Sequence, residues 1–374
     1  MLKLKEFKDY LNFQEQVREN LKNLKELTDY FPDLLKENLN LLKEKGYLGV
    51  PYPKEYGGLG LDYLHYAIVI EEISKICPST GLTVAAHTSL CSFPIFKYGN
   101  EEQKRKYLIP LAKGEKIGAM GLTEPNAGSD ASAIELRAKK ESNFYILNGT
   151  KRYITNSQEA EIFVIIGTLD RNLGKKGITA FIIEKNFKGF SIGKEEDKLG
   201  VRGSSTCELI FEDCQVPQEN LLGKEGEGYK YIMETLDGGR ISIAAFSLGI
   251  AKRAYEAILF WEKKRETKSE IVYRIIAEAD NLIESASLLT YYAALLKNQG
   301  ERADKESANA KLYASETAVK ICDYALSLYG YYGISKELNL ERFFRDAKIC
   351  EIGEGTSEIM KLIIAREALK IFKF

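Results

Sequence analysis

Histidine is scarce in this chain of 374 residues, which contains only His65 and His87. Two histidines leave little material for a catalytic triad or for a histidine-rich metal site. No apolar run of about 18 residues occurs, so the sequence predicts no membrane span. The charges balance, with 53 Lys and Arg against 54 Asp and Glu. The chain therefore lacks the excess of basic residues that is typical of a nucleic-acid-binding protein. Any chemistry must therefore fall to carboxylates, hydroxyls or a bound cofactor.

The sequence also lacks a C-x-x-C pair and a secretory signal. Its opening residues, MLKLKEFKDYLNFQEQ, carry acidic side chains and have no apolar segment, so we expect a cytoplasmic protein. In that compartment cysteines stay reduced, and we expect a mostly buried, structural role for all of them. The six cysteines are Cys77, Cys91, Cys207, Cys214, Cys322 and Cys350.

The residue pattern changes twice along the chain, from helical to β-strand and back to helical, which predicts an α+β protein of three domains. Residues 1–115 are helical in pattern, because leucines recur at a spacing of three and four. Residues 116–223 alternate short β-branched or aromatic runs with turn residues. Residues 224–374 are helical again and predict a four-helix bundle. The leucines of the first domain are Leu21, Leu24, Leu27, Leu34, Leu35, Leu39 and Leu42.

Five short runs predict the strands of the middle domain. Asn148-Gly149 separates the first two runs and predicts a β-hairpin with a type I′ turn. Because no helical pattern lies between the runs, we expect an antiparallel sheet or a small barrel. The runs span residues 144–147, 151–155, 162–168, 178–184 and 207–211.

Periodic stretches predict four helices in the last domain, at about 241–264, 271–298, 304–329 and 357–372. Asp304 and Ser357 are predicted to be N-caps, and Gly330 is predicted to be a C-cap.

Three segments carry groups suited to chemistry. Gly121–Asp130 is dense in short polar side chains, and Tyr153–Ser157 offers a ring and a hydroxyl on one side of a strand. Ile352–Glu358 holds a carboxylate, Glu354, between two glycines, where backbone can approach a ligand closely. Taken singly, these segments could equally be a polar connector, a cross-strand pair and a solvated loop.

Together and in this order, the segments resemble the acyl-CoA dehydrogenase family of flavoproteins. The resemblance covers nearly the whole chain and rests on five long matches. They are EEQKRKYLIPLAKGEKIGAMGLTEPNAGSD, LNGTKRYITN, KLGVRGSSTCELIFEDCQVP, GRISIAAFSLGIAKRAYE and RDAKICEIGEGTSEI. The family fold is helical, then β, then a four-helix bundle.

The resemblance implies FAD-dependent dehydrogenation of an acyl-CoA to a trans-2-enoyl-CoA. Glu354 matches the family base, which removes the α-proton while the β-hydrogen leaves as hydride to FAD. Some relatives place the base directly before the arginine of the segment that here reads Asp237-Gly-Gly-Arg240, but this chain has Gly239 there. A carboxylate normally has a pKa of about 4.3, so burial and hydrogen bonds to the thioester oxygen must assist it. The implied electron acceptor is an electron-transferring flavoprotein.

The same matching implies which residues surround the cofactor and the substrate. FAD is expected to contact Leu122, Thr123, Gly128, Ser129, Tyr153, Thr155, Arg265 and Thr356. The acyl-CoA is expected to contact Ser129, Asp237, Arg240, Gly353 and Gly355. Tyr153 replaces the usual tryptophan, which keeps an aromatic face of smaller area.

The sequence departs from the family where FAD of a neighbouring subunit is held. No Q-F-G follows the first bundle helix in the segment 261–271, and the later Q-x-x-G-G has Ser327 and Tyr331 in place of its glutamine and second glycine. One hypothesis is a heteromer in which a paralogous subunit completes the FAD site. The other, which we favour, is a homotetramer in which Arg265 and other basic residues hold the FAD tail.

Gly353 stands where the family often has tyrosine beside the base, and this predicts a pocket that accepts branched or bulky acyl groups. Two other functions remain open at this point. One is a relative that runs as an enoyl-CoA reductase or reacts with oxygen, since the same residues serve either direction. The other is a non-catalytic subunit, which the presence of Glu354 disfavours.

Overall fold

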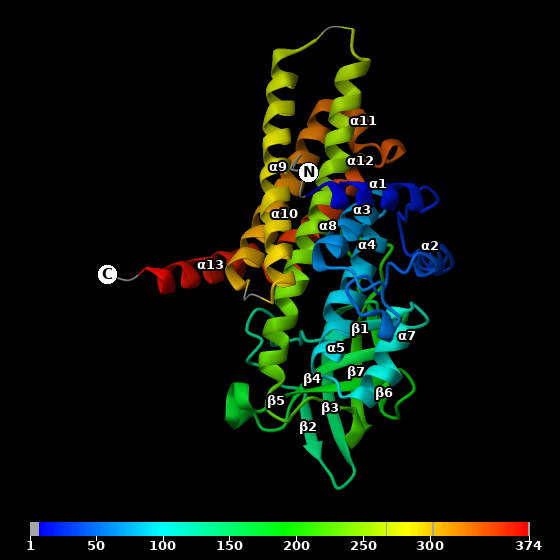
Figure 1. The fold of residues 1–374 in the computed structure, drawn as a ribbon, viewed down its shortest axis with the longest axis vertical. Helices are drawn as coiled ribbons and strands as arrows, with labels where there is room; N and C mark the ends of the chain where they lie inside the picture. Colours follow the sequence, from blue (N-terminus) through cyan, green and yellow to red (C-terminus); the bar gives the residue numbers. More distant parts are fainter. Residues whose placement is uncertain (1–6, 267, 301–302, 373–374) are drawn as a thin grey trace.

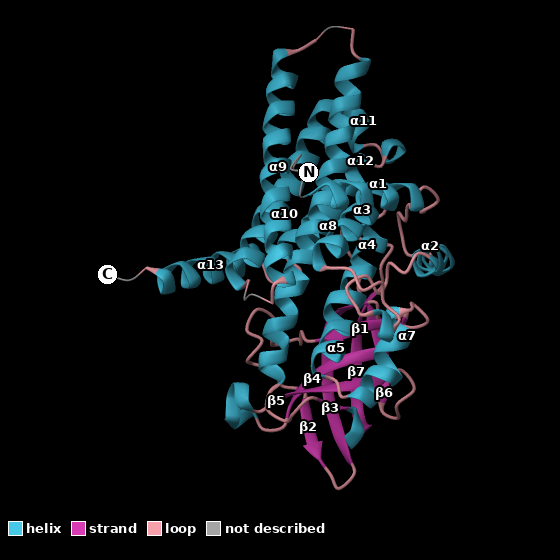
Figure 2. Ribbon diagram, viewed as in Figure 1, coloured by secondary structure: helices cyan, strands magenta, loops and turns pink. Residues whose placement is uncertain are grey.

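The computed structural model describes residues 7–266, 268–300 and 303–372. Helices form the upper and larger part of the molecule and strands gather at its lower end (Figures 1 and 2). The helix–strand–helix order along the chain confirms the predicted fold class.

The first helical part consists of α1 (Lys8–Asn20), α2 (Pro32–Glu44), α3 (Tyr63–Ile76), α4 (Pro78–Ala85), α5 (Phe93–Tyr98), α6 (Glu101–Gln103) and α7 (Ile109–Ala112). α2 and α4 each begin with a proline, whose fixed φ suits the first turn of a helix. α3 begins after Asp62, whose carboxylate accepts a hydrogen bond from the His65 N–H as an N-cap. The leucines at 21, 24 and 27 lie after the end of α1, although their side chains are buried in the core. Their spacing therefore reflects packing rather than a helix.

The middle part is one sheet of eight strands. These are β1 (Ile117–Gly121), β2 (Arg137–Lys140), β3 (Phe144–Thr155), β4 (Ala160–Thr168), β5 (Ile178–Glu184), β6 (Phe190–Glu195), β7 (Thr206–Pro217) and β8 (Leu221–Leu222). They follow the order β6-β7-β3-β2-β4-β5-β8, with β1 also paired to β4. The sheet is mixed rather than purely antiparallel, because β1 and β2 both pair with β4 in parallel.

The predicted hairpin at Asn148-Gly149 was wrong. β3 runs straight through these residues and pairs along its length with β7. Asn148 lacks the positive φ that a type I′ turn needs at both of its central residues, and the pairing shifts register between Leu147 and Gly149, whose φ is +141°. The glycine therefore marks a β-bulge, the other structure that favours glycine within a strand.

The last part is built on α8 (Gly228–Lys264), α9 (Glu270–Asn298) and α10 (Asp304–Tyr329), followed by α11 (Tyr331–Ile334), α12 (Leu340–Lys348) and α13 (Ser357–Ile371). α10 packs against α8, α9 and α13, and α13 projects away from the body of the molecule (Figure 1). Gly330 ends α10 as predicted. Ala303 and Thr356, not Asp304 and Ser357, are the N-caps, so both predicted caps were displaced by one residue.

Buried apolar side chains join these parts. One cluster unites the first helices with α8, α9 and α10, and two more cover the two faces of the sheet. Alternate residues of β4 divide between the faces: Val164 belongs to the cluster that includes helical residues, and the Phe163 ring packs against the Phe190 ring of β6 at 4.9 Å. The six cysteines are buried and free, as expected. None of the described helices has an apolar stretch long enough to cross a bilayer.

Candidate active site

Glu354 lies in a tight turn between a 3-10 helix, Ile349–Glu351, and the start of α13. Its φ is +54° and that of Gly355 is +103°, so two consecutive residues occupy the positive-φ region. Such a conformation costs a glutamate on the order of 1–3 kcal/mol and persists only where the surroundings hold it. The Gly353 N–H donates to the Ile349 carbonyl at 2.8 Å, and the Thr356 hydroxyl accepts from the Ile359 N–H at 3.3 Å. The turn is thus fixed on both sides of Glu354.

The carboxylate of Glu354 points into the protein. Its Oε2 atom is buried and has no hydrogen-bond partner among the described residues. A Cβ placed on Gly239 of α8 would lie 2.0 Å from this oxygen, so the carboxylate occupies the space that any side chain at 239 would need. Burial raises the pKa of Glu354 to about 7, while Lys311 and Arg240 oppose the shift. A carboxyl group with this pKa is suited to act as a base near neutral pH.

Asp237 and Arg240 face the same region from α8. Arg240 donates to the Asp237 carboxylate at 2.8 Å, and both side chains are buried. Burial and a hydrogen bond with Asp304 raise the pKa of Asp237 to about 7, against the opposing charge of Arg240. Burial lowers the pKa of Arg240. The structure therefore brings together Glu354, Gly239, Arg240 and Asp237, four positions that the family resemblance had singled out.

Three further groups around Glu354 escaped the sequence analysis. Lys311 of α10 is fully buried and donates to the Gly355 carbonyl at 2.6 Å. Tyr63 and Tyr66 of α3 are buried, and the charge of Glu354 contributes to raising the pKa of both phenols. These residues come from helices far from Glu354 in the sequence, so only the tertiary fold reveals them. A lysine within an otherwise alanine-rich stretch of α10 was the one available signal.

The Gly121–Asp130 segment and the end of β3 lie side by side. The Lys151 ammonium donates to the Glu124 carboxylate at 2.6 Å and to the Leu122 carbonyl at 2.9 Å, and the Arg152 N–H donates to the Thr123 carbonyl at 2.8 Å. Lys151 and Glu124 are both buried, and burial lowers the pKa of Lys151 to about 8 despite the opposing effect of Glu124. This ion pair, which the sequence analysis missed, fixes the polar loop to the sheet.

Tyr153 presents its ring to the outside at a bulge in β3. Its φ is +57°, its side chain is 58% exposed, and its ring lies 5.2 Å from the Arg152 guanidinium. Ile154 is buried and Thr155 is half-buried, so the residues at 153 and 155 turn away from the core. Gly128 and Ser129 are exposed in the neighbouring loop. The result is an open aromatic face next to hydroxyl and backbone groups.

Arg265 lies apart from the other predicted site residues. It is the exposed C-cap of α8 and is 25 positions from Arg240 on that continuous helix, a rise of about 37 Å. Arg265 therefore cannot complete the Glu354 site of its own chain. Thr356 is half-buried, and its hydroxyl already caps α13.

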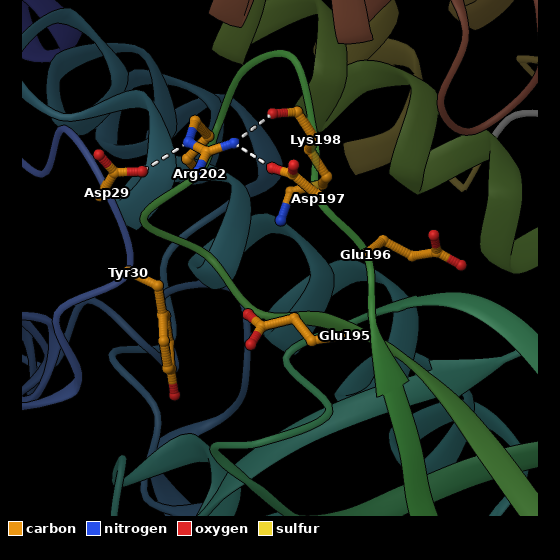
Figure 3. Close-up of a pocket in the computed structure, with 7 residues that line it drawn as sticks. All are labelled: Asp29, Tyr30, Glu195, Glu196, Asp197, Lys198 and Arg202. Atoms are coloured by element: carbon orange, nitrogen blue, oxygen red, sulfur yellow. Dashed lines mark hydrogen bonds and ion pairs between the residues drawn. The ribbon is translucent and has the colours of Figure 1, made fainter.

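A separate surface pocket of about 410 Å³ lies between the segment after α1 and the β6–β7 connection (Figure 3). Arg202 bridges Asp29 and Asp197 across it. Four carboxylates against two cations make the pocket unsuited to an anionic ligand such as the phosphates of CoA. Its lining residues are Asp29, Tyr30, Glu195, Glu196, Asp197, Lys198 and Arg202, and none of them was a predicted site residue.

The two histidines, His65 and His87, form hydrogen bonds that stabilise the fold. The Nδ1 atom of buried His87 accepts from the Gly118 N–H at 3.1 Å, and its Nε2 atom lies 3.2 Å from the Leu111 carbonyl. Because Nδ1 accepts, Nε2 carries the proton and donates, and the ring ties β1 to the helices. Burial lowers the pKa of His87 to about 4. His65 pairs with Asp62 at 2.8 Å at the start of α3.

The fold and the site define a three-part protein of helices, a mixed sheet and helices, in which a strained turn holds the Glu354 carboxylate against α8 with its Oε2 atom buried. Three family models match the chain in succession: the acyl-CoA dehydrogenase N-terminal domain over residues 10–115, the middle domain over 119–214 and the C-terminal domain over 226–369. The chain belongs to the acyl-CoA dehydrogenase family, whose members are oxidoreductases.

Individual relatives agree with this placement. The chain is 51% identical over 352 residues to the short-chain-specific acyl-CoA dehydrogenase of Clostridium acetobutylicum, which covers 92% of this chain and 91% of the relative. The butyryl-CoA dehydrogenase structure of Megasphaera elsdenii superposes with a TM-score of 0.92 at 39% identity and covers 99% of both chains. A structure described as the electron transferring flavoprotein of Acidaminococcus fermentans superposes with a TM-score of 0.93 at 42% identity, over 97% of this chain and 98% of that one.

Proposed function

We propose that this chain dehydrogenates a short-chain acyl-CoA thioester to the trans-2-enoyl-CoA, with Glu354 as the base. The observation that carries the proposal is the buried Oε2 atom of Glu354, which lacks a hydrogen-bond partner within the described part of the chain and lies against Gly239. A buried carboxylate oxygen without a partner lowers the stability of the fold, so each such group calls for an explanation, and a binding or catalytic role is one. The short-chain relatives support an acyl group about the size of butyryl.

In this reaction Glu354 takes the α-proton of the substrate. The α-carbon forms a double bond with the β-carbon, whose hydrogen leaves with its electron pair. A base with a pKa of about 7 accepts a proton more readily than an ordinary glutamate, because its charged form is poorly solvated. The backbone N–H of Glu354 is the proposed donor to the thioester oxygen, where it stabilises the developing negative charge. Asp237, Arg240, Gly353, Gly355 and Ser129 are proposed to contact the acyl-CoA.

The residues present fit an isoalloxazine ring. Tyr153 offers an exposed aromatic face, and the adjoining loop is held by the Lys151–Glu124 ion pair, so its polar groups are fixed before a ligand arrives. We assign the ring contacts of FAD to Leu122, Thr123, Gly128, Ser129, Tyr153, Thr155 and Thr356. FAD, when bound, supplies the acceptor for the β-hydride. Arg265 is proposed to contact the adenosine diphosphate of FAD on a neighbouring subunit.

Partners and location complete the proposal. An electron-transferring flavoprotein is the proposed acceptor, because the acyl-CoA dehydrogenase family implies one and a chain that superposes on this protein comes from a structure described as the electron transferring flavoprotein of Acidaminococcus fermentans. A homotetramer in the cytoplasm is the proposed state of the protein. The same residues also suit an enoyl-CoA reductase or an oxidase. Kinetic measurements with each substrate and electron acceptor distinguish these activities from the dehydrogenase.

The test is an anaerobic titration of the purified holoprotein with butyryl-CoA. We expect the absorbance of the oxidised flavin to bleach with wild-type protein. We expect no bleaching with Glu354→Gln, which keeps the shape of the side chain but removes the base. Glu316→Gln is the matched control, because Glu316 is an exposed carboxylate paired with Lys361 at 3.2 Å. Bleaching at the wild-type rate by Glu354→Gln would refute the assigned base.

A further inference from the structure

Lys311 is an unusual residue in α10, because its side chain is fully buried. An ammonium group that leaves water is costly unless charge or hydrogen bonds replace its hydration. Its Nζ atom donates to the Gly355 carbonyl at 2.6 Å. Burial lowers the pKa of Lys311 to about 8, and the acidic groups Cys350, Glu354 and Glu351 counteract this shift. The lysine is therefore retained in a place that disfavours it, beside the candidate base.

The hydrogen bond of Lys311 is made to the carbonyl of the peptide that joins Gly355 to Thr356. This peptide directly follows the two residues with positive φ, +54° at Glu354 and +103° at Gly355. A turn of this kind relaxes unless neighbouring groups hold it. Gly353 is tied to Ile349 and Thr356 caps α13, but both bonds stay within the local chain. Among the hydrogen bonds of the described residues, only the one from Lys311 ties the turn to another long helix.

The charge of Lys311 also acts on the Glu354 carboxylate. The groups that face this carboxylate are Lys311 on α10, Arg240 on α8, and the phenols of Tyr63 and Tyr66 on α3. Arg240 is already paired with Asp237 at 2.8 Å, so part of its charge is compensated. Lys311, in contrast, forms no ion pair with a carboxylate of the described residues. It is thus the main uncompensated positive charge beside the base.

We propose that Lys311 is a positioning residue for Glu354: its ammonium group holds the Glu354–Gly355 turn through the Gly355 carbonyl and supplies the buried positive charge opposite the carboxylate. This inference rests on the proposed function, because it assumes that Glu354 is the base. Removing the charge leaves only Arg240 to oppose the effect of burial, and the Glu354 carboxyl group then ionises at higher pH.

The test compares Lys311→Met, Lys311→Gln and Lys311→Arg in the holoprotein. Methionine removes charge and donor, glutamine keeps a neutral donor, and arginine keeps the charge. We expect the acid limb of the kcat/KM profile to move up by about one pH unit in the first two variants, and less in Lys311→Arg. Lys311→Gln decides the question if Lys311→Met does not fold. The matched control is Lys252→Met, because Lys252 is a largely buried lysine that pairs with Glu71 at 2.6 Å and lies about 18 Å from Arg240 along α8.

A second readout does not depend on turnover. Infrared difference titration follows the carboxyl band of Glu354, which Glu354→Gln identifies by removing it. We expect the band to titrate at higher pH in Lys311→Met than in wild type. An unchanged profile and an unchanged band in both uncharged variants would overturn the inference, whereas full activity of Glu354→Gln would overturn the proposed function instead.

Discussion

The environment of Glu354 predicts how activity depends on pH. Burial raises the pKa of its carboxyl group to about 7, so below that pH the group is protonated and cannot accept the α-proton. We expect kcat/KM to rise about tenfold per pH unit below pH 7 and to level off above it. Steady-state rates in buffers of constant ionic strength measure this limb. A profile that stays flat down to the ordinary pKa of glutamate would contradict the burial argument.

The absence of a side chain at Gly353 predicts which acyl groups the protein accepts. A Cβ added there would meet only Ile349, at 3.4 Å and beyond, so the position is not crowded by the protein itself. We expect the wild type to turn over branched short acyl-CoAs such as isobutyryl-CoA. We expect Gly353→Tyr to lose this activity by tenfold or more, while its rate with butyryl-CoA falls less. A kcat/KM panel measures the ratio, and a strict preference of the wild type for straight chains would sink the prediction.

The Lys151–Glu124 ion pair holds two elements together, the polar loop and the end of β3. Both partners are buried, so replacing one leaves the other charge without compensation. We expect Lys151→Met to lower the free energy of unfolding by about 3–5 kcal/mol. Lys106→Met is the control, because Lys106 pairs with Glu184 at the surface and its loss is expected to cost less than about 1 kcal/mol. Urea unfolding measures both, and equal losses would argue against the pair's structural role.

At the scale of elements, the sequence predicted long periodic helices well and strand connections poorly. α10 spans the predicted residues 304–329 apart from its N-cap, because its apolar period is regular and Gly330 ends it, whereas α8 begins at Gly228, well before its predicted start at residue 241. Asn148-Gly149 was misread as a hairpin because a bulge and a type I′ turn favour the same residue types. β6 and β8 were missed, and so were β1 and β2, since IGAMG and RAKK lack the β-branched pattern of a strand. Their pairing with β4 is set by tertiary contacts, which a local pattern does not record.

The candidate site shows the same division. Glu354, Gly239, Arg240 and Asp237 could be predicted because their motifs are contiguous in the sequence. Lys311, Tyr63 and Tyr66 were not predicted, because they lie on helices far from Glu354 in the sequence and only the tertiary fold brings them near it; the lysine within the alanine-rich stretch of α10 was the one signal. The Lys151–Glu124 pair spans 27 positions and is visible only when the loop is folded onto the sheet.

At the scale of the whole molecule, the two segments that the sequence analysis expected to depart from the family lie side by side. The Trp261 ring of α8 lies 4.5 Å from the Tyr329 ring of α10, and the Tyr329 hydroxyl donates to the Ala257 carbonyl at 2.9 Å. The described residues of segment 261–271 and the stretch from Ser327 to Tyr331 therefore lie together at one end of the bundle. Tyr331 is 80% exposed there. Changes on both sides of one contact are what a single remodelled binding surface would require.

This arrangement makes the assembly testable, because Arg265 lies on the same end, about 37 Å along α8 from Arg240. If that end holds the FAD tail of a neighbouring copy, the chain expressed alone will form a homo-oligomer with one FAD per chain. We expect Arg265→Met to lower FAD retention at least threefold without changing the oligomer. Arg253→Met is the control, since Arg253 is a half-exposed arginine of the same helix. Flavin absorbance with light scattering measures both quantities. A chain that keeps FAD only after a paralogous subunit is added would instead establish the heteromer, because the remodelled end would then be unable to complete the cofactor site of an identical copy.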